Sequence, residues 1–272
     1  MDRFDRQRQI FGDEGQERLR RTIVAVVGGG GLGAFVVLEL AYLGAGKIVI
    51  LDADALERSN RNRLVGAWES HPDGMLKVEV LQALVQLIDS SIEVVAIPSW
   101  FESPEGGKAL EEVDVIMGCV DRDGARLGLN ELACDRGIPL IDMASDTFVD
   151  SDGVLFGGRV CVATPETGCL SCQSVLDQEE IRLDLSTEEQ RVDDAAIYGV
   201  DRALLGAGGP AVVTVNGVVA SLGVTELMVL VTGIRPPFAQ LDYRGHDGVI
   251  RRVVDRAPGC YFCGLRPRES AE

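Results

Sequence analysis

The stretch Thr22-Ile-Val-Ala-Val-Val-Gly-Gly-Gly-Gly-Leu-Gly33 decides the fold class of this chain. Its β-branched, apolar part predicts a buried parallel strand. The strand stops at the first of three glycines with the spacing G-x-G-x-x-G, namely Gly28, Gly30 and Gly33. Such glycines let the backbone turn sharply and approach a phosphate, whose charge suits the unpaired N–H groups at the start of the following helix. The stretch therefore predicts a phosphate-binding turn between a strand and a helix.

A second strand and an acidic residue complete the pattern. A helix is expected over residues 34–43, and residues 47–51 predict the second strand, which closes on Asp52. An acidic residue about twenty residues after the glycines, at the end of a strand, is in the position that accepts a hydrogen bond from a ribose hydroxyl. A glycine-rich turn that binds nothing is the alternative. The strand, helix and acid together favour a nucleotide-binding βαβ unit.

The chain beyond Asp52 predicts a doubly wound, mostly parallel Rossmann-like sheet with right-handed crossovers. Helices and strands alternate, with helices expected over 77–88, 104–112 and 122–136 and strands over 92–97, 113–117 and 139–143. The segment 52–63 between them is too polar for a core and reads as a functional loop.

After Ser145 the pattern changes to an antiparallel C-terminal extension. Residues 149–162 predict antiparallel strands joined by tight turns at Asp152-Gly153 and Gly157-Gly158. An acidic surface loop is expected over 178–194, then a long helix over about 210–231 and strands over 240–243 and 249–254. No linker is apparent. We therefore expect one domain over 1–272, made of an N-terminal arm (1–21), a nucleotide-binding part (22–145) and an antiparallel and crossover-loop part (146–272), which also contains two C-x-x-C pairs.

Composition narrows the classes of partner and the compartment. The net charge is −17, which argues against nucleic acid and anionic membranes as partners. One stretch, 211–231, is long enough for a membrane span, but Asn216 and Glu226 interrupt it and favour a buried helix. The N-terminus lacks an apolar signal region. We therefore expect a cytoplasmic protein.

Four of the seven cysteines form two C-x-x-C pairs, Cys169/Cys172 and Cys260/Cys263. Two such thiolate knuckles that meet in space make a closed tetrahedral Zn(Cys)₄ site, which is structural because it has no open position for chemistry. Two redox-active pairs or a disulfide framework are the alternatives, and a reducing compartment disfavours disulfides. The other cysteines, Cys119, Cys134 and Cys161, are expected to be buried free thiols.

These motifs together resemble the MoeB/ThiF/HesA family, the bacterial relatives of ubiquitin-activating enzymes, over nearly the whole chain. They are the Arg3-Phe4-x-Arg6-Gln7 arm, the glycine run, Asp52-x-Asp54, Ser59-Asn60-x-x-Arg63, Lys77, Asp121-x-x-x-x-Arg126-x-x-x-Asn130 and both cysteine pairs. The resemblance implies an adenylyltransferase that uses MgATP to adenylate the C-terminal glycine carboxylate of a small ubiquitin-like or sulfur-carrier protein, with a peptide substrate as the variant.

The resemblance also implies the site residues. At the nucleotide we expect Gly28, Gly30, Gly31, Gly33, Asp52, Asp54, Ser59, Asn60, Arg63, Lys77, Asp121 and Arg122. Arg63 and Lys77 would offset the repulsion between the attacking carboxylate and the phosphates, and Asp121 would hold Mg²⁺. Arg6 looks like the arginine that this family lends across a homodimer to the partner's ATP. No general base is needed, because a tail carboxylate is already ionised at neutral pH.

The chain also departs from the family pattern. Leu64 stands where the family usually has glutamine, and Arg122 where it usually has asparagine. No cysteine lies between Cys172 and Cys260, which excludes a thioester or persulfide on the crossover loop, and the expected product is the free acyl adenylate. The alternatives are a nicotinamide-dependent oxidoreductase, which would leave the basic loop 59–63 unexplained, and an adenylation-defective scaffold. The identity of the carrier stays open.

Overall fold

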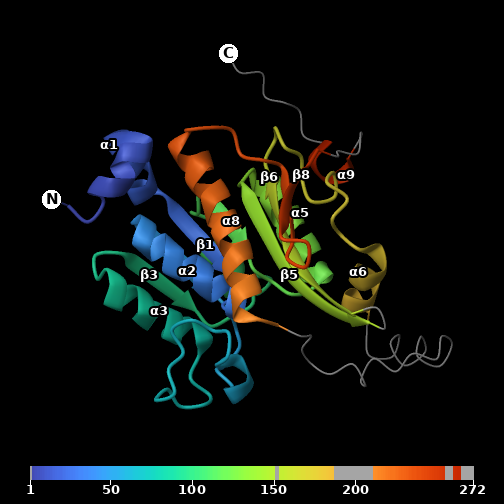
Figure 1. Ribbon diagram of the computed structural model, residues 1–272, viewed down its shortest axis with the longest axis horizontal. Coiled ribbons are helices and arrows are strands. Elements are labelled where there is room, and N and C mark those ends of the chain that lie inside the picture. Colours follow the sequence, from blue (N-terminus) through green and yellow to red (C-terminus); the bar gives the residue numbers. More distant parts are fainter. Residues whose placement is uncertain (1, 151–152, 187–210, 255–259, 265–272) are drawn as a thin grey trace.

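The computed structural model describes residues 2–150, 153–186, 211–254 and 260–264. Among them, eight strands form one sheet in the order β3-β2-β1-β4-β5-β6-β7-β8 (Figure 1). The strands are β1 (Ile23–Val27), β2 (Lys47–Leu51), β3 (Glu93–Ile97), β4 (Val115–Gly118), β5 (Leu140–Asp150), β6 (Gly153–Ala163), β7 (Gln240–Arg244) and β8 (Val249–Val253). Neighbours from β3 to β5 are parallel, and those from β5 to β8 are antiparallel. The predicted α/β sheet with an antiparallel extension is confirmed.

Helices cover both faces of this sheet. They are α1 (Asp5–Arg21), α2 (Gly31–Leu43), α3 (Lys77–Ile88), α4 (Pro104–Ala109), α5 (Asp123–Arg136), α6 (Gln178–Leu185), α8 (Val213–Thr232) and α9 (Tyr261–Gly264), with a 3₁₀ turn η1 (Arg58–Asn60). The helices α2, α3 and α8 pack on one face, as Figure 1 shows, and α4 and α5 pack on the other.

The apolar run of β1 is explained by burial on both faces. Val24 and Val26 belong to the core under α2, α3 and α8, whereas Ala25 and Val27 belong to the core under α5. Because side chains alternate along a strand, a strand covered on both sides needs apolar residues at every position. This local pattern made β1, β2 and α3 predictable to the residue.

The strand order places a topological switch point between β1 and β4. The chain runs outward from β1 to β2 and β3 and then returns to β4 on the other side of β1. In open α/β sheets, ligands bind at such a switch point, outside the carboxyl ends of the strands. The loop that follows β1 and the loop that follows β4 meet there.

The pair Gly157-Gly158 is not a turn, so this prediction is wrong. Both glycines lie inside β6, opposite Asp146 and Ser145 of a β5 that is longer than expected. A Cβ on Gly157 would overlap the backbone oxygen of Tyr243 in β7. These glycines serve a close approach between strands. The strand β5 ends at Asp150 and β6 begins at Gly153, and Asp152 of the other predicted turn lies outside the described residues.

The predicted acidic loop over 178–194 is wrong for its first part. Residues 178–185 form α6, whose N-cap Asp177 accepts hydrogen bonds from the backbone N–H groups of Glu179 and Glu180. Local capping outweighs the low apolar content here. Residues 187–194 lie outside the described residues.

The long apolar helix α8 is a core helix of the fold, as expected. It is long and apolar enough to cross a membrane by length and composition, with a mean hydropathy of 1.7 over its best window, half of which is buried. Its inner face packs on β5 and β6, where Val219 approaches Gly158 and Gly223 approaches Met143. Glycine at these two positions lets the helix lie close to the sheet.

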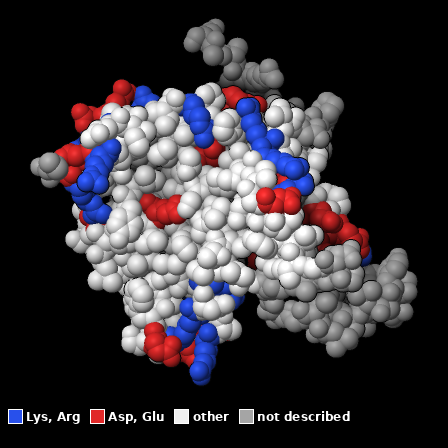
Figure 2. Space-filling model, viewed as in Figure 1, with Lys and Arg blue, Asp and Glu red and all other residues white. Residues whose placement is uncertain are grey.

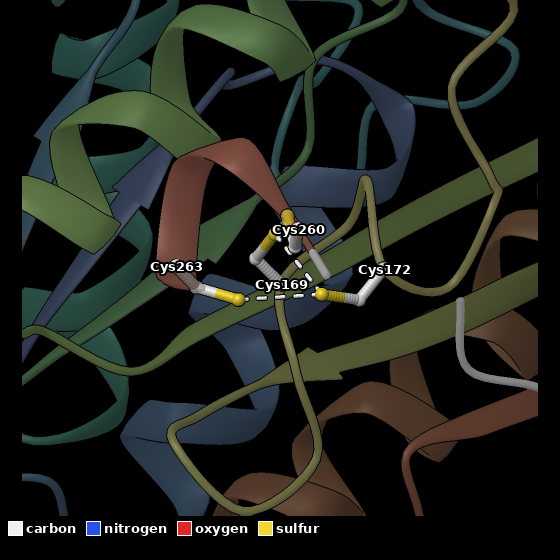
Figure 3. A group of neighbouring side chains, drawn as sticks. All are labelled: Cys169, Cys172, Cys260 and Cys263. Carbon is white, nitrogen blue, oxygen red and sulfur yellow. Dashed lines mark hydrogen bonds between the residues drawn. The ribbon is translucent and has the colours of Figure 1, made fainter. Parts of the chain in front are cut away.

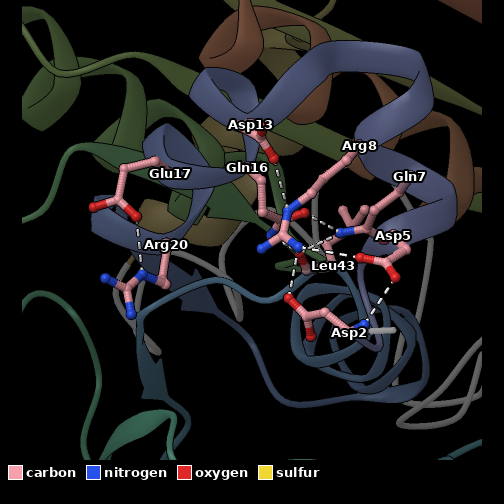
Figure 4. Close-up of polar contacts among 9 residues, drawn as sticks. All are labelled: Asp2, Asp5, Gln7, Arg8, Asp13, Gln16, Glu17, Arg20 and Leu43. Carbon is pink, nitrogen blue, oxygen red and sulfur yellow. Dashed lines mark hydrogen bonds and ion pairs between the residues drawn. The ribbon is translucent and has the colours of Figure 1, made fainter.

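The N-terminal arm packs on its own chain, although its sequence shows no clear apolar periodicity. Helix α1 is kinked at Gly12 and buries Phe11 and Leu19. Gln7 donates a 2.9 Å hydrogen bond to the backbone oxygen of Leu43 at the end of α2 (Figure 4). The kink hid the period of the apolar residues, because it shifts the helical phase between its two halves.

Candidate nucleotide site and metal centre

Two glycines allow the loop between β1 and α2 to pack against the end of β4. Gly28 has a φ of +99°, and a Cβ there would lie 2.6 Å from the backbone oxygen of Cys119. A Cβ on Gly33 would overlap the backbone oxygen of Gly28. Only glycine meets both the positive φ and these close approaches. The two glycines therefore fix the sharp turn at the switch point.

The first turn of α2 is open to an anion. Gly30 is its N-cap, no side chain caps the turn, and a Cβ on Gly30 would meet no atom within 4 Å. The free N–H groups and the positive end of the helix dipole suit a phosphate. Arg63 lies beside this turn, since its Cγ would be 3.0 Å from a Cβ on Gly31.

Asp52 ends β2 and is buried against the glycine loop. Its Oδ2 accepts a 2.6 Å hydrogen bond from the backbone N–H of Gly29, and its Oδ1 accepts a 2.7 Å bond from that of Asp54. Burial raises the pKa of this carboxyl, and the nearby Lys77 ammonium opposes the rise. The two bonds orient the carboxylate and leave lone pairs for a ribose hydroxyl.

Lys77 and Asp54 form an ion pair next to Asp52. Lys77 begins α3, its side chain is 10% exposed, and its Nζ lies 2.7 Å from Asp54 Oδ2. The backbone N–H of Lys77 also donates to the backbone oxygen of Asp54. A buried ammonium group needs an anionic partner, and a phosphate oxygen could take the place of the Asp54 carboxylate.

Ser59, Asn60 and Arg63 lie on the turn that contains η1. Ser59 Oγ donates to the Glu57 carboxylate at 3.1 Å, and Asn60 Oδ1 accepts from the Glu57 backbone N–H at 3.0 Å. The Arg63 guanidinium donates to the Ser59 backbone oxygen at 2.7 Å. Arg63 is therefore the predicted residue of this turn that contacts the glycine loop. Leu64 is 3% exposed and packs in the core, so it contributes no polar group.

Asp121 and Arg122 are exposed on the loop between β4 and α5, and they contact none of the other predicted residues within the described ranges. Arg126 of the same motif braces this loop, with hydrogen bonds to the Val120 backbone oxygen at 2.8 Å and to Asp123 Oδ1 at 2.6 Å. Asp121 is therefore an exposed carboxylate on a braced loop at the switch point.

Arg6 does not belong to this site within one chain. The N-terminal segment lies at the C-terminal ends of α2 and α3, where Gln7 of α1 donates to the Leu43 backbone oxygen and Arg3, just before α1, pairs with Asp89 at 2.9 Å. The glycine loop is at the other end of α2, which has 13 residues and is about 20 Å long. Arg6 is exposed at the edge of the sheet opposite the site.

Asn216 is a residue of the site that the sequence analysis missed. It is buried near the start of α8, its Oδ1 accepts a 2.6 Å hydrogen bond from Ser145 Oγ, and its Nδ2 lies beside the turn at Gly31. The sequence analysis counted it only as an interruption of an apolar run. An asparagine within an otherwise apolar helix could have indicated this role, because a buried amide needs hydrogen-bond partners.

A group of four charged side chains on the α5 face of the sheet was also missed: Asp123, Arg126, Asp142 and Arg159. Arg126 Nε lies 3.6 Å from Asp142 Oδ1, and Asp142 is fully buried. Burial raises the pKa of Asp142, while the guanidinium groups of Arg126 and Arg159 oppose the rise. These residues come from α5, β5 and β6, so their proximity depends on the tertiary fold.

The two cysteine pairs meet, as predicted (Figure 3). The four Sγ atoms lie within 4.8 Å of one another, with Cys169–Cys172, Cys169–Cys260 and Cys172–Cys263 separations of 3.8, 3.4 and 3.2 Å. A tetrahedral ion with four sulfur ligands at 2.3 Å would set them about 3.8 Å apart. The donor set and its spacing fit zinc, which the four thiolates would hold without an open coordination position.

Cys134 lies beside this cluster, although the sequence analysis treated it as a buried free thiol. It lies on α5 and is half-buried, and the neighbouring Cys169 together with burial raises the pKa of its thiol. Cys161 is buried as expected, and Cys119 is partly exposed next to the glycine loop.

Comparisons with known proteins agree with this geometry. A model described as the ThiF family matches residues 4–268. The sulfur carrier protein ThiS adenylyltransferase of Escherichia coli (strain K12) is 28% identical over 265 residues, which are 94% of this chain and 93% of that protein. The sulfur carrier protein adenylyltransferase of Thermus thermophilus is 29% identical over 275 residues, 99% of this chain and 93% of that protein.

The fold is shared with a solved structure of E. coli MccB in complex with MccA-N7isoASN. The TM-score is 0.74 at 23% identity, over 97% of this chain and 75% of that chain. With the family match across nearly all residues, the resemblance read from the sequence is confirmed. The chain belongs to the ThiF family of adenylyltransferases.

Proposed function

We propose that this chain uses ATP and Mg²⁺ to adenylate the C-terminal carboxylate of a ubiquitin-like or sulfur-carrier protein, or of a peptide, and releases pyrophosphate. One observation carries the proposal: the open N-terminus of α2, Asp52, Lys77 and Arg63 lie together at the carboxyl ends of β1 and β2. Relatives named as carrier-protein adenylyltransferases support it, as do structures of E. coli MccB with ATP and with AMPCPP and MccA.

The charges at this edge suit the reaction. A carboxylate must approach the α-phosphate of an anionic nucleotide, and Arg63, Lys77 and the α2 N-terminus would reduce the repulsion. Lys77 would exchange Asp54 for a phosphate oxygen. Asp121, exposed on the braced loop after β4, supplies the kind of oxygen ligand that Mg²⁺ takes beside its waters and phosphates. When bound, Mg²⁺ would stabilise charge on the departing pyrophosphate.

The acyl adenylate would pass to an external nucleophile. The chain has no cysteine from residue 173 to residue 259, so a crossover-loop thioester has no acceptor. Zinc held by the two cysteine pairs would be structural. We treat residues 1–272 as one adenylation domain and place it in the cytoplasm, where ATP is available and thiols stay reduced.

We also propose a homodimer in which Arg6 completes the partner's site. Helix α8 begins beside the glycine loop, where Asn216 meets Gly31, and ends beside α1, where Arg18 donates to the Thr232 backbone oxygen. Its 20 residues span about 30 Å. A two-fold axis through the middle of α8 would therefore bring the partner's α1 to this chain's glycine loop.

The surface of α2 and α8 suits a second copy. Figure 2 shows few charged side chains over these helices, on a protein whose net charge is −17. The partly buried side chains here include Phe35, Leu38 and Leu222. The carboxylate of Glu39 accepts a hydrogen bond from Ser221, and burial raises its pKa. A face with so few charged side chains favours burial in an interface.

The proposal is tested by ATP–pyrophosphate exchange with purified candidate carriers, beside a direct measurement of NAD binding. Exchange that depends on both the carrier and Mg²⁺, with no NAD binding, is the expected result. NAD binding without exchange would support an oxidoreductase, and neither activity across carriers and peptides would support a scaffold. A carrier without its terminal glycine is the matched control.

A further inference from the structure

A groove of about 260 Å³ lies on the sheet face that also carries α5, between β6 and β7. Gly157 and Gly158 form part of its floor, so an extended peptide backbone can lie close to the strands there. Its lining carries Asp146, Arg159 and Arg244 among its charged residues. None of these has a role in the nucleotide site described above.

The strand register places Arg159 at the inner end of this groove. Gly118, the last residue of β4, pairs with Asp142, which pairs in turn with Cys161 of β6. Arg159 is the next residue of β6 on the same face, and Gly157, opposite Asp146, is one step further out. The groove therefore leads from the hairpin tip towards the carboxyl edge of the parallel strands, where the nucleotide site lies.

Two of the three nitrogen atoms of the Arg159 guanidinium lack a hydrogen-bond acceptor within the described ranges. Its Nε and Nη2 atoms are buried and have no hydrogen-bond partner among the described residues. Its nearest ion pair, from Nη2 to Asp123 Oδ1, is at the 4.0 Å limit. By contrast, Arg244 at the outer end pairs with Asp242 at 3.2 Å. Buried N–H groups without acceptors are costly, and a carboxylate is the acceptor that a guanidinium binds best.

We propose that Arg159 binds the C-terminal carboxylate of the substrate's tail at the inner end of this groove. The inference rests on the proposed function and adds the residue that would recognise the tail terminus. Arg159 lies at the inner end of the groove and Asp146 lies outward from it, which suits a peptide that enters with its C-terminal carboxylate first. Asp146, one step outward, can accept a backbone N–H of the preceding tail residue. Asp123 joins the two sites, because it contacts Arg159 and lies two residues after Asp121.

The test measures binding without ATP in the full chain. The probe is acetyl-Gly-Gly with a free carboxylate, compared with acetyl-Gly-Gly-amide, and the readout is the Nε–Hε NMR signal of Arg159 in ¹⁵N-arginine-labelled protein. We expect this signal to shift with the acid, and the amide to bind at least about tenfold more weakly. Arg159→Gln should weaken acid binding about tenfold, as followed at the Gly157 amide. Arg136→Gln, at the other end of α5, is the control and should not change it.

Equal affinity for the acid and the amide, or unchanged acid affinity in Arg159→Gln, would overturn the inference and leave Arg159 as a counterion for Asp142. If Arg159→Gln fails to fold, the acid–amide comparison in the wild-type chain still decides. The assay contains no nucleotide, so its outcome is separate from that of pyrophosphate exchange. Acid-specific binding without any exchange would refute adenylation and leave the carboxylate site in place.

Discussion

Arg6→Ala and Lys77→Ala chains, each weak alone, should regain activity when they exchange subunits. Lys77 lies at the glycine-loop edge of the sheet and Arg6 at the opposite edge, separated by about the 20 Å length of α2. The two side chains can therefore serve one site only across a dimer interface. A mixed dimer has one site with both residues intact and one site with neither.

The size of the recovery follows from this pairing. Random exchange of equal amounts makes about half of the dimers mixed, and each mixed dimer has one intact site. The mixture should therefore recover about one quarter of wild-type activity per chain, and purified mixed dimers about one half. If Arg6 acted in the site of its own chain, mixing the two variants would restore no activity at any ratio of the two chains.

The assay is carrier-dependent ATP–pyrophosphate exchange on mixed dimers isolated through two different affinity tags. Arg20→Ala is the matched control, because Arg20 is a second exposed arginine of α1 that pairs only locally, with Glu17 (Figure 4). This variant should keep full activity. Isolated mixed dimers no more active than their parents, or full activity of Arg6→Ala alone, would refute the assignment.

Three further outcomes are expected. Asp121→Ala should abolish Mg²⁺-dependent exchange, and its melting temperature should not change because the side chain is exposed. Glu131→Ala on α5 is the control, and wild-type exchange in Asp121→Ala would reject the Mg²⁺ assignment. Elemental analysis should find one zinc per chain, and the Cys172→Ser variant should lose the zinc and melt at least about 5 °C lower. Wild-type protein without zinc, or an unchanged melting temperature in the variant, would contradict the metal centre. Hydrogen bonds from Ser91 hold the pKa of Asp89 below its usual 3.8, with Arg3 adding to the effect, so its contribution to stability is present above pH 3.8 and lost as the pH falls through the folded-state value. Urea titrations should therefore show Asp89→Asn less stable than wild type at pH 7, with the difference shrinking below about pH 4; a constant difference would count against this linkage.

The nucleotide-binding half was predictable because its signals are local. The strands β1 and β2 are buried on both faces, so apolar residues are needed on both sides of each strand. The two glycines that the turn requires, Gly28 and Gly33, follow β1 directly within one short stretch of sequence. The same holds for α3, whose apolar face repeats at helical spacing. The cysteine pairs were predictable across a long separation only because metal ligation leaves a spacing signature.

The features that sequence reasoning missed depend on contacts between distant segments. The residues Gly157-Gly158 look like a turn, and only the approach of β7 shows that they lie within a strand. In the sequence, Asn216 only interrupts an apolar helix, and its role becomes clear once α8 is placed beside the glycine loop. Arg159 carries no motif, and the missing hydrogen-bond partners of its Nε and Nη2 atoms among the described residues become evident only from its burial between α5 and β6.

The cysteine cluster also changes the connectivity of the molecule. A metal that joins Cys172 to Cys260 closes the intervening polypeptide into a ring, which contains α8, β7 and β8. Closing so long a ring removes conformational freedom from the unfolded chain, so the metal stabilises helices and strands that it never touches. A single cut of the backbone anywhere within the ring would leave the two pieces joined through the ion, and a chelator would remove that second connection.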